Sequence, residues 1–300
     1  MAATISQTRA QAAPHTLTSA GKERPAARNA WHTILYIVLV FYSVVSLGPF
    51  IFALIASFKT YADVLSPSLI PHPFTLSNYQ DIFGSSSANL FPQYILNSLI
   101  YAGATAALNV LLASMAGYAF GRMEFYGRNV LFALTLAVLM IPSQLILIPK
   151  FLVANSLGLT DSLGALIVPA MVQPTMVFLM TQFLKSLPKE LEESAMIDGA
   201  SRFRIFWQII LPLARPAMTA VAILSFQGAW NDFLWPLIVQ AHQQNYTLTV
   251  GLAAFHTLNY TEYNLLLAGS AINLLPLVVI FFFFQRYFIQ GISTSGLAGR

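Results

Sequence analysis

The chain has 300 residues, of which 57% are hydrophobic and only 9% are charged, with a mean hydropathy of +0.67. So few charges cannot solvate a water-soluble globule of this size, and the composition therefore indicates a membrane protein. No cysteine is present, which excludes disulfides and thiolate metal sites. The sequence pI of about 9.3 would suit a nucleic-acid-binding protein, but the placement of the basic residues explains it better.

The first 30 residues are polar, rich in Ala, Thr, Ser and Gln, and show no sustained apolar period. They predict a disordered tail. A secretory signal peptide is the competing interpretation, but the apolar run that follows, 33–58, is far longer than a signal core of roughly 7–15 residues. We therefore expect this run to be a first membrane helix.

Five further apolar stretches predict membrane helices, since each approaches the roughly 20 residues that cross a hydrocarbon core. They cover residues 98–120, 130–148, 163–183, 217–239 and 266–288. The predicted fold is an all-α membrane protein with six transmembrane helices in one membrane domain, residues 31–290. An even number of spans places both termini on the same side.

The basic residues determine the predicted orientation. With the N-terminus inside, every Lys and Arg except Lys59 and Lys150 falls in an inside segment. This asymmetry is the positive-inside pattern, so the N- and C-termini and the loop 185–216, between spans four and five, are predicted to be cytosolic.

The outer segments differ in character. Residues 59–93 contain four prolines and predict an irregular or partly helical loop over the outer membrane interface. Residues 240–264 are polar, and we expect them to be long enough to reach a soluble partner. Within the spans, Gly103, Gly117 and Gly121 would permit close helix packing or have no special role.

The cytosolic loop predicts two short helices with a break between them. Pro188 suits a first helical position, and Glu190, Glu192 and Glu193 place negative charge at the positive end of the helix dipole. Gly199 is the expected C-terminal stop, because only glycine takes a left-handed conformation without steric cost.

The second short helix is predicted to begin after Ser201, whose hydroxyl can cap it, and to end at Pro212. Its apolar residues recur at helical spacing: Phe203, Phe206, Trp207 and Ile210. The expected product is a bent, partly apolar structure outside the membrane.

At this point the chain resembles a known family, the permease subunits of bacterial ABC importers, through their "EAA" signature. The matching positions are Glu193, Ala195, Gly199, Ile209, Leu211 and Pro212, and Ser194 replaces the middle Ala. The runs Asp198-Gly199-Ala200 and Trp230-Asn231-Asp232-Phe233 look like the carbohydrate branch, specifically its second, maltose-type permease. The resemblance extends from the first span to the C-terminal tail.

The resemblance implies that the first short helix is a coupling helix, seated in a groove of an ATPase subunit. The residues implied in coupling are Glu192, Glu193, Ser194, Ala195, Asp198, Gly199 and Ala200. Of these, Glu193 would contact a basic partner residue, Ala195 would allow close approach and Gly199 would permit the sharp exit.

The implied partners are a homologous second permease, two ATPase subunits, an extracytoplasmic solute-binding protein, membrane lipid and a sugar, with no nucleic acid. The implied location is the bacterial inner membrane. No Gly-x-x-x-x-Gly-Lys-Ser/Thr loop occurs, so ATP and Mg are expected on the partner ATPase, and this chain is expected to bind no cofactor.

The candidates for the translocation path are Gln227, Asn231 and Asp232, because ionisable groups within a membrane usually face the bundle interior or an aqueous path. In a continuous helix Asp232 would lie about 22 Å beyond Ala217, near the outer boundary, so snorkelling or a structural hydrogen bond explains it equally well. Residues 291–300 resemble the family's Gly-rich tail, which reaches the ATPase interface; a frayed end is the alternative.

Other function classes are less well supported. An importer of a glycerol-phosphate-like solute would share this scaffold. A membrane enzyme acting on lipid-linked sugars would need convergent charged residues at one face, and a secondary transporter would need coupling-ion carboxylates near mid-membrane. No catalytic constellation occurs, and the five scattered histidines form no metal-ligand set.

Overall fold

Helices make up nearly all the regular structure. The computed structural model describes residues 25–84, 90–256 and 261–297, with side chains described only between residues 31 and 284 of these ranges. No strand occurs in this part of the chain, where the one extended pairing is an isolated bridge between His256 and Thr261. The predicted all-α class is confirmed.

The helices fall into long and short groups. The long and medium helices are α1 (Pro25–Ala56), α4 (Phe91–Arg122), α5 (Arg128–Leu139), α6 (Leu147–Ser156), α8 (Pro174–Ser186), α12 (Arg215–Trp230) and α15 (Tyr263–Leu297). The short ones are α2 (Tyr61–Val64), α3 (Ser77–Phe83), α7 (Leu163–Ala170), α9 (Glu190–Ile197), α10 (Arg202–Ile205), α11 (Leu211–Leu213), α13 (Leu234–Val239) and α14 (Leu248–Ala253). A π turn, η1, covers Phe206–Ile210, and a 3₁₀ turn, η2, covers Gln243–Asn245.

The chain divides into two units, residues 1–51 and 52–300. In the first unit the structure describes residues 25–51, which belong to the helix α1. This helix starts at Pro25, six residues before the predicted membrane domain. The predicted disordered residues 1–24 lie outside the described part of the chain. The stretch of α1 from Trp31 onward is apolar and long enough to span a bilayer, and its large apolar side chains are exposed, whereas Ala56 at its end is buried. Such a surface requires lipid or another apolar partner.

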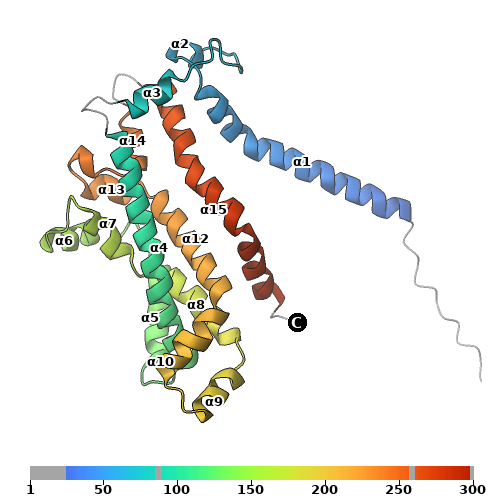
Figure 1. Cartoon of the computed structure of the whole chain (residues 1–300), viewed down its shortest axis with the longest axis vertical. Helices are drawn as coiled ribbons and strands as arrows, with labels where there is room; N and C mark the ends of the chain where they lie inside the picture. The colour runs from blue at the N-terminus through green and yellow to red at the C-terminus, as the bar shows by residue number, and fades with distance from the viewer. Residues whose placement is uncertain (1–24, 85–89, 257–260, 298–300) are drawn as a thin grey trace, which may run out of the picture. The chain divides into compact units, whose positions relative to one another are not determined.

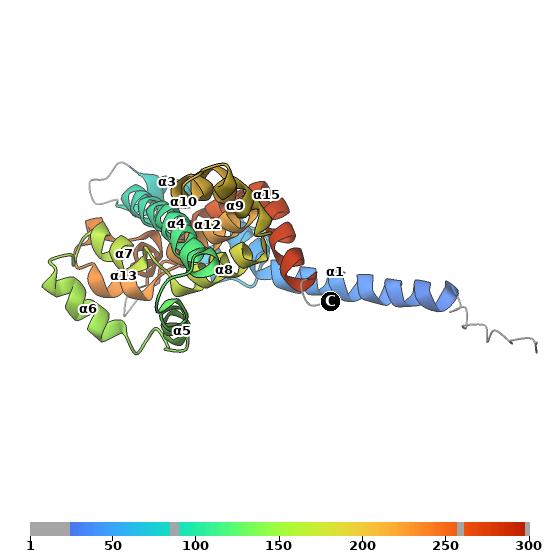
Figure 2. The ribbon, with the colours of Figure 1, turned by 90° about the horizontal axis from the view of Figure 1, so that it is seen from below.

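The second unit is built on α4, which packs against α12 and α8 along its length, while α12 also packs against α15. Figure 1 shows these helices side by side, with α9 and α10 at one end of α4 and α3 and α14 at the other. Seen from below, α6, α7 and α13 lie together on one side of the α4–α12 pair (Figure 2).

Close packing of α4 on α8 depends on two of the three predicted small residues. A Cβ on Gly117 would lie 2.8 Å from the Cβ of Met180, and one on Gly121 would lie 3.3 Å from the carbonyl oxygen of Thr181. A Cβ on Gly103 would meet nothing within 4 Å. Gly117 and Gly121 therefore permit the approach of the two helices, and Gly103 does not contribute.

The span predictions hold in part. Among the residues that the structure describes, four helical segments are long and apolar enough to cross a membrane, and a fifth span would be the pair Arg202–Leu213 and Arg215–Trp230, bent by 77°. The predicted span 130–148 is interrupted, because α5 ends at Leu139 and Pro142 follows within the break before α6. The predicted span 217–239 is also interrupted, between Trp230 and Leu234.

A buried asparagine holds the break between α7 and α8. The Asn109 side chain, fully buried in α4, donates to the carbonyl oxygen of Ala170 at 2.7 Å and accepts from the backbone N–H of Gln173 at 2.9 Å. These are the backbone groups that an interrupted helix leaves without partners. One amide from a neighbouring helix thus allows the chain to bend inside an apolar environment.

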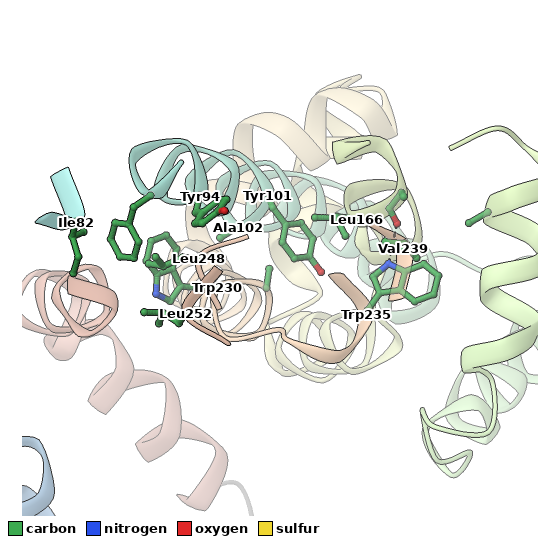
Figure 3. Packing of buried hydrophobic residues seen from close by; sticks show 14 of the residues in the cluster. Ile82, Tyr94, Tyr101, Ala102, Leu166, Trp230, Trp235, Val239, Leu248 and Leu252 are labelled. Atoms are coloured by element: carbon green, nitrogen blue, oxygen red, sulfur yellow. Dashed lines mark hydrogen bonds between the residues drawn. The ribbon is translucent and has the colours of Figure 1, made fainter. Parts of the chain in front are cut away.

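Part of the segment 240–264 packs into the bundle, while residues 241–244 are exposed, so its predicted reach to a soluble partner stays a prediction. Leu248 and Leu252 are buried in an aromatic core with Tyr94 and Trp230 (Figure 3). In the same cluster the indole N–H of Trp235 donates to the carbonyl oxygen of Ala165 at 2.9 Å. The apolar side chains of α14 draw this segment into the fold. At the C-terminus, α15 continues to Leu297, so residues 291–297 of the predicted tail are helical.

Candidate functional site

The first short helix of the predicted coupling loop is α9, and its C-terminal stop is the predicted glycine. Gly199 has φ +80°, the left-handed conformation. The N–H of Ala200 donates to the carbonyl oxygen of Ala195 at 2.9 Å, and the N–H of Gly199 donates to that of Met196 at 3.0 Å. This pair of bonds is a Schellman motif, which satisfies the last carbonyl groups of the helix.

The starts of both short helices lie within two residues of their predicted positions. The helix α9 begins at Glu190, two residues after Pro188, and its first turn contains the three predicted glutamates. Ser201 caps the second helix, where its hydroxyl oxygen accepts from the N–H of Arg204 at 3.4 Å. Helix starts depend on caps and charges within a few residues, which explains why the sequence located them closely.

The second helix ends at Leu213, one residue after the predicted end at Pro212. Helical turns continue from Arg202 to Leu213, because η1 is a π turn in which the N–H of Leu211 donates to the carbonyl oxygen of Phe206 five residues earlier. The wider π turn accommodates the proline ring and its missing donor. The chain bends only at Ala214, ahead of α12.

A buried ion pair joins α9 to the end of α4. The side chains of Arg122 and Glu192 are only 2% and 7% exposed, and the guanidinium Nε donates to the carboxylate. The other guanidinium nitrogens donate to the carbonyl oxygens of Leu187 and Pro188, each at 2.8 Å. The hydroxyl of Tyr118 donates to the second carboxylate oxygen of Glu192 at 3.3 Å. Arg122 thus fixes both the end of α8 and the start of α9 to α4.

The predicted coupling residues separate into an inner and an outer set. Glu192 and Ala195 face α4 and the apolar cluster around Met180 and Ile205, so the close approach that Ala195 allows is to this chain itself. Glu193, Ser194, Asp198 and Gly199 are exposed, and Ala200 is half-buried. Large apolar side chains accompany them: Ile197 is 86% exposed and Phe203 is 70% exposed. The outer surface of α9 and α10 is therefore charged and apolar, with Lys189, Arg202 and Arg204 exposed beside the acidic residues, and α9 is held from behind by α4.

The predicted path residues do not all share one environment. Gln227 and Asn231 are exposed on the same side of α12, and the Asn231 amide donates to the carbonyl oxygen of Gln227 at 3.1 Å. Asp232 is half-buried in the break before α13, where its carboxylate accepts from the hydroxyl of Tyr101 at 3.0 Å. Gln227 and Asn231 therefore form one polar surface, and Asp232 has a structural hydrogen bond.

Asp161 joins two connecting segments that are far apart in the sequence. Asp161, between α6 and α7, accepts at one carboxylate oxygen from the N–H groups of Ala241 and His242, at 2.9 and 3.0 Å, and its other oxygen contacts the His242 ring. These contacts, led by the His242 N–H, hold the pKa of Asp161 well below its usual range. Asp161 fixes the loop 240–246 to the α6–α7 connection.

Comparison with known proteins gives the family. Residues 109–294 match the model of the "Binding-protein-dependent transport system inner membrane component". The chain belongs to this family of ABC transporter permeases. It is a transport subunit rather than an enzyme, and it resembles the sugar permeases of the family.

Two curated relatives illustrate the similarity. The arabinooligosaccharides transport system permease protein AraQ of Halalkalibacterium halodurans is 37% identical over 270 residues, which cover 89% of this chain and 96% of the relative. The diacetylchitobiose uptake system permease protein NgcG of Streptomyces coelicolor is 34% identical, with 87% of each chain covered. Both relatives are permeases for oligosaccharides by name.

A solved structure shares the fold. A chain of a bacterial ABC transporter involved in the import of the acidic polysaccharide alginate superposes with a TM-score of 0.78 at 20% identity, covering 87% of this chain and 98% of that one. The permease fold of this chain therefore extends well beyond the 109–294 region of the family model.

Sequence reasoning missed Arg122 and Tyr118, which hold α9 from behind, and Asn109, which holds the break between α7 and α8. All three were expected only as parts of a span or of the positive-inside pattern. The available signal was weak: a basic residue in the last turn of a helix, which also suits the helix dipole. Within the described residues no group of three or more His, Asp or Glu side chains could hold a metal ion.

Proposed function

We propose that the chain is one of two permease subunits of an ATP-driven importer of sugars or oligosaccharides in the bacterial inner membrane. It has six spans with cytosolic termini, the interrupted segments α5–α6 and α12–α13 included, and α9 is its coupling helix. ATP and Mg bind to two partner ATPase subunits, and a solute-binding protein delivers the sugar from outside.

The observation that carries this proposal is the two-sided construction of α9. Its inner side is bonded to α4 through Arg122 and Glu192, while Glu193 and Ile197 are exposed on α9 and Phe203 is exposed on the neighbouring α10. A helix that transmits force must be attached firmly to its own chain and present a separate surface to its partner. A basic residue of the ATPase would pair with Glu193, and the exposed apolar side chains would enter its groove.

The same attachment gives a mechanism. Arg122, the last residue of α4, bonds to Glu192 of α9 and to Leu187 at the end of α8. Motion of the docked ATPases therefore passes from α9 to α4, the helix against which α8 and α12 pack. Gln227 and Asn231 on the exposed side of α12 line the path and supply amide groups for sugar hydroxyls. The oligosaccharide class rests on the names of the relatives.

The test is a pull-down of the tagged chain from detergent-solubilised native membranes, with copurifying proteins identified. We expect the wild type to recover an ATPase and a second permease. Glu193→Lys should lose or weaken the ATPase and keep the permease, because a cation would face the basic groove. Asp81→Lys, the same charge change at an exposed position on α3, at the other end of α4 from α9, is the matched control. Recovery of the chain alone in every form would overturn the importer assignment.

A further inference from the structure

The segment after the first span has an exposed apolar surface that transport does not account for. Between residues 65 and 76, which we call the apolar loop, five large side chains are at least half exposed. They are Leu65, Leu69, Ile70, Phe74 and Leu76. A surface of this kind on a soluble protein would be an aggregation hazard or an interaction site.

Two charged residues that precede the apolar loop, Lys59 and Asp63, bond to groups within it and fix its shape. The Lys59 side chain is 1% exposed, and its ammonium donates to the carbonyl oxygens of Asp63 and Ser68. The carboxylate of Asp63 accepts from the N–H of His72 at 2.9 Å and from the hydroxyl of Ser66 at 3.0 Å. Both charges of the segment are therefore directed inward, and the apolar side chains remain outside.

The loop is attached at the level where spans end. The Asn78 amide donates to the carbonyl oxygens of Ser57 and Lys59, at 2.7 and 2.8 Å, just beyond the end of α1. The side-chain oxygen of Asn78 accepts from the amide of Asn264, at the start of α15, at 2.8 Å. Figure 1 shows α2 and α3 beside this end of α15. The loop thus lies at the boundary of the hydrocarbon core.

The charge pattern identifies what covers the loop. From Val64 to Gln80 there is no Asp, Glu, Lys or Arg. An interface with a soluble protein normally has a polar and charged rim, whereas the layer between headgroups and acyl chains accepts uncharged apolar side chains. Leu54 and Ile55, at the end of the first span, are also exposed apolar residues.

We propose that the apolar loop inserts its leucine, isoleucine and phenylalanine side chains into the boundary between headgroups and acyl chains of the bilayer. The loop then fixes the depth of the α1 end and of the α15 start in the membrane. This surface takes lipid as its partner, and it works independently of the solute and of the ATPase.

The test measures lipid contact directly. The natural chain has no cysteine, so single cysteines can be spin-labelled in the full-length protein. Leu69→Cys and Phe74→Cys report on the loop, with Ile70→Cys as a replacement for either if it lowers the melting temperature. Val45→Cys, mid-span in α1, is the lipid reference, and Gln80→Cys, an exposed polar position on α3, is the matched control. The protein is placed in lipid nanodiscs and collision rates with oxygen and with a water-soluble nickel chelate are compared.

We expect the oxygen-to-nickel ratio at the loop positions to exceed that at Gln80 several-fold and to approach the ratio at Val45. Nickel access equal to that at Gln80 would show that the loop faces water. Low access to both reagents would show that protein covers it. Either result would overturn lipid insertion without affecting the importer assignment, which depends on the pull-down.

Discussion

At its C-terminal end α4 is joined to the rest of the molecule by a buried ion pair, whereas near its N-terminal end separate hydrogen bonds from uncharged side chains of α4 make the contacts. Arg122 and Glu192 carry the first attachment. At the other end, Asn97 donates to the carbonyl oxygens of Gln244 and Tyr246, and the hydroxyl of Ser98 accepts from the N–H of Leu248 at 2.7 Å. The first end depends on one charged pair, and the second distributes its attachment over several weaker bonds.

This difference has energetic consequences. A neutral hydrogen bond contributes about 1 kcal/mol, so the loss of one leaves the others in place. Removing one member of a buried ion pair costs about 3–5 kcal/mol, because the other charge remains without a partner. The end that carries the proposed coupling helix should therefore be sensitive to single substitutions, and the opposite end should tolerate them.

The largest effect is expected from Arg122→Ala, which leaves Glu192 buried without its cation and also frees the carbonyl groups of Leu187 and Pro188. We expect a loss of about 3–5 kcal/mol in the free energy of unfolding, measured by denaturant titration in mixed micelles. Arg122→Met combined with Glu192→Met should recover much of it. If Arg122→Ala lowered the free energy of unfolding by less than about 1 kcal/mol, the attachment of α9 to α4 would not depend on the Arg122–Glu192 pair.

Gly117→Val should rank next, because its Cβ would lie 2.8 Å from that of Met180 and force α4 and α8 apart. Overpacking of this kind costs about 1–3 kcal/mol. Gly103→Val, on the same helix where a Cβ meets nothing within 4 Å, is the control. Equal melting temperatures for the two variants would contradict the role of Gly117 in helix packing.

Asn97→Leu tests the N-terminal end of α4, where several hydrogen bonds share the attachment. It removes two hydrogen bonds to the loop after α13 and a third from the side chain of Gln93, and we expect a loss of about 1–2 kcal/mol in the unfolding free energy. The contrast with Arg122→Ala, measured under the same conditions, is the decisive quantity. A loss as large as that of Arg122→Ala would mean that the two ends do not differ as the contacts indicate.

Gly199→Val should act through the backbone, because φ is +80° while space around the Cα is open. The strain for a branched residue is of order 1–2 kcal/mol, and it falls on the exit of α9. We expect uptake to be lost with membrane insertion intact. Gly199→Asn, which tolerates the left-handed region, should retain most uptake; normal uptake by the valine variant would show that the sharp exit is dispensable.

The smallest effect is expected at Asp161, through pH. Its pKa is lowered in the folded protein, so its stabilising contribution is complete above the unfolded value of about 4 and is lost as pH falls through the folded value. The difference in melting temperature between wild type and Asp161→Asn should therefore be constant near neutral pH and shrink below about pH 4. A difference that grows on acidification would have the wrong sign for this account.

Much of the coupling loop was predictable from sequence because its signals are local. Gly199 needs a left-handed backbone, Ser201 supplies a cap, and the glutamates suit a helix start; each depends on only a few neighbouring residues. Composition likewise indicated a membrane protein, because lipid imposes that constraint on any chain. The orientation inferred from the Lys and Arg pattern stays a prediction.

Tertiary structure alone determined which of two adjacent glutamates faces inward. Glu192 and Glu193 have the same chemistry, and only the position of Arg122, 70 residues earlier, makes one an internal partner and leaves the other exposed. The breaks at residues 171–173 and 231–233 were decided in the same way, because Asn109 and Tyr101 on α4 bond to the groups at those breaks. Long-range partners of this kind leave no local pattern in sequence, since the chain brings them together only by folding.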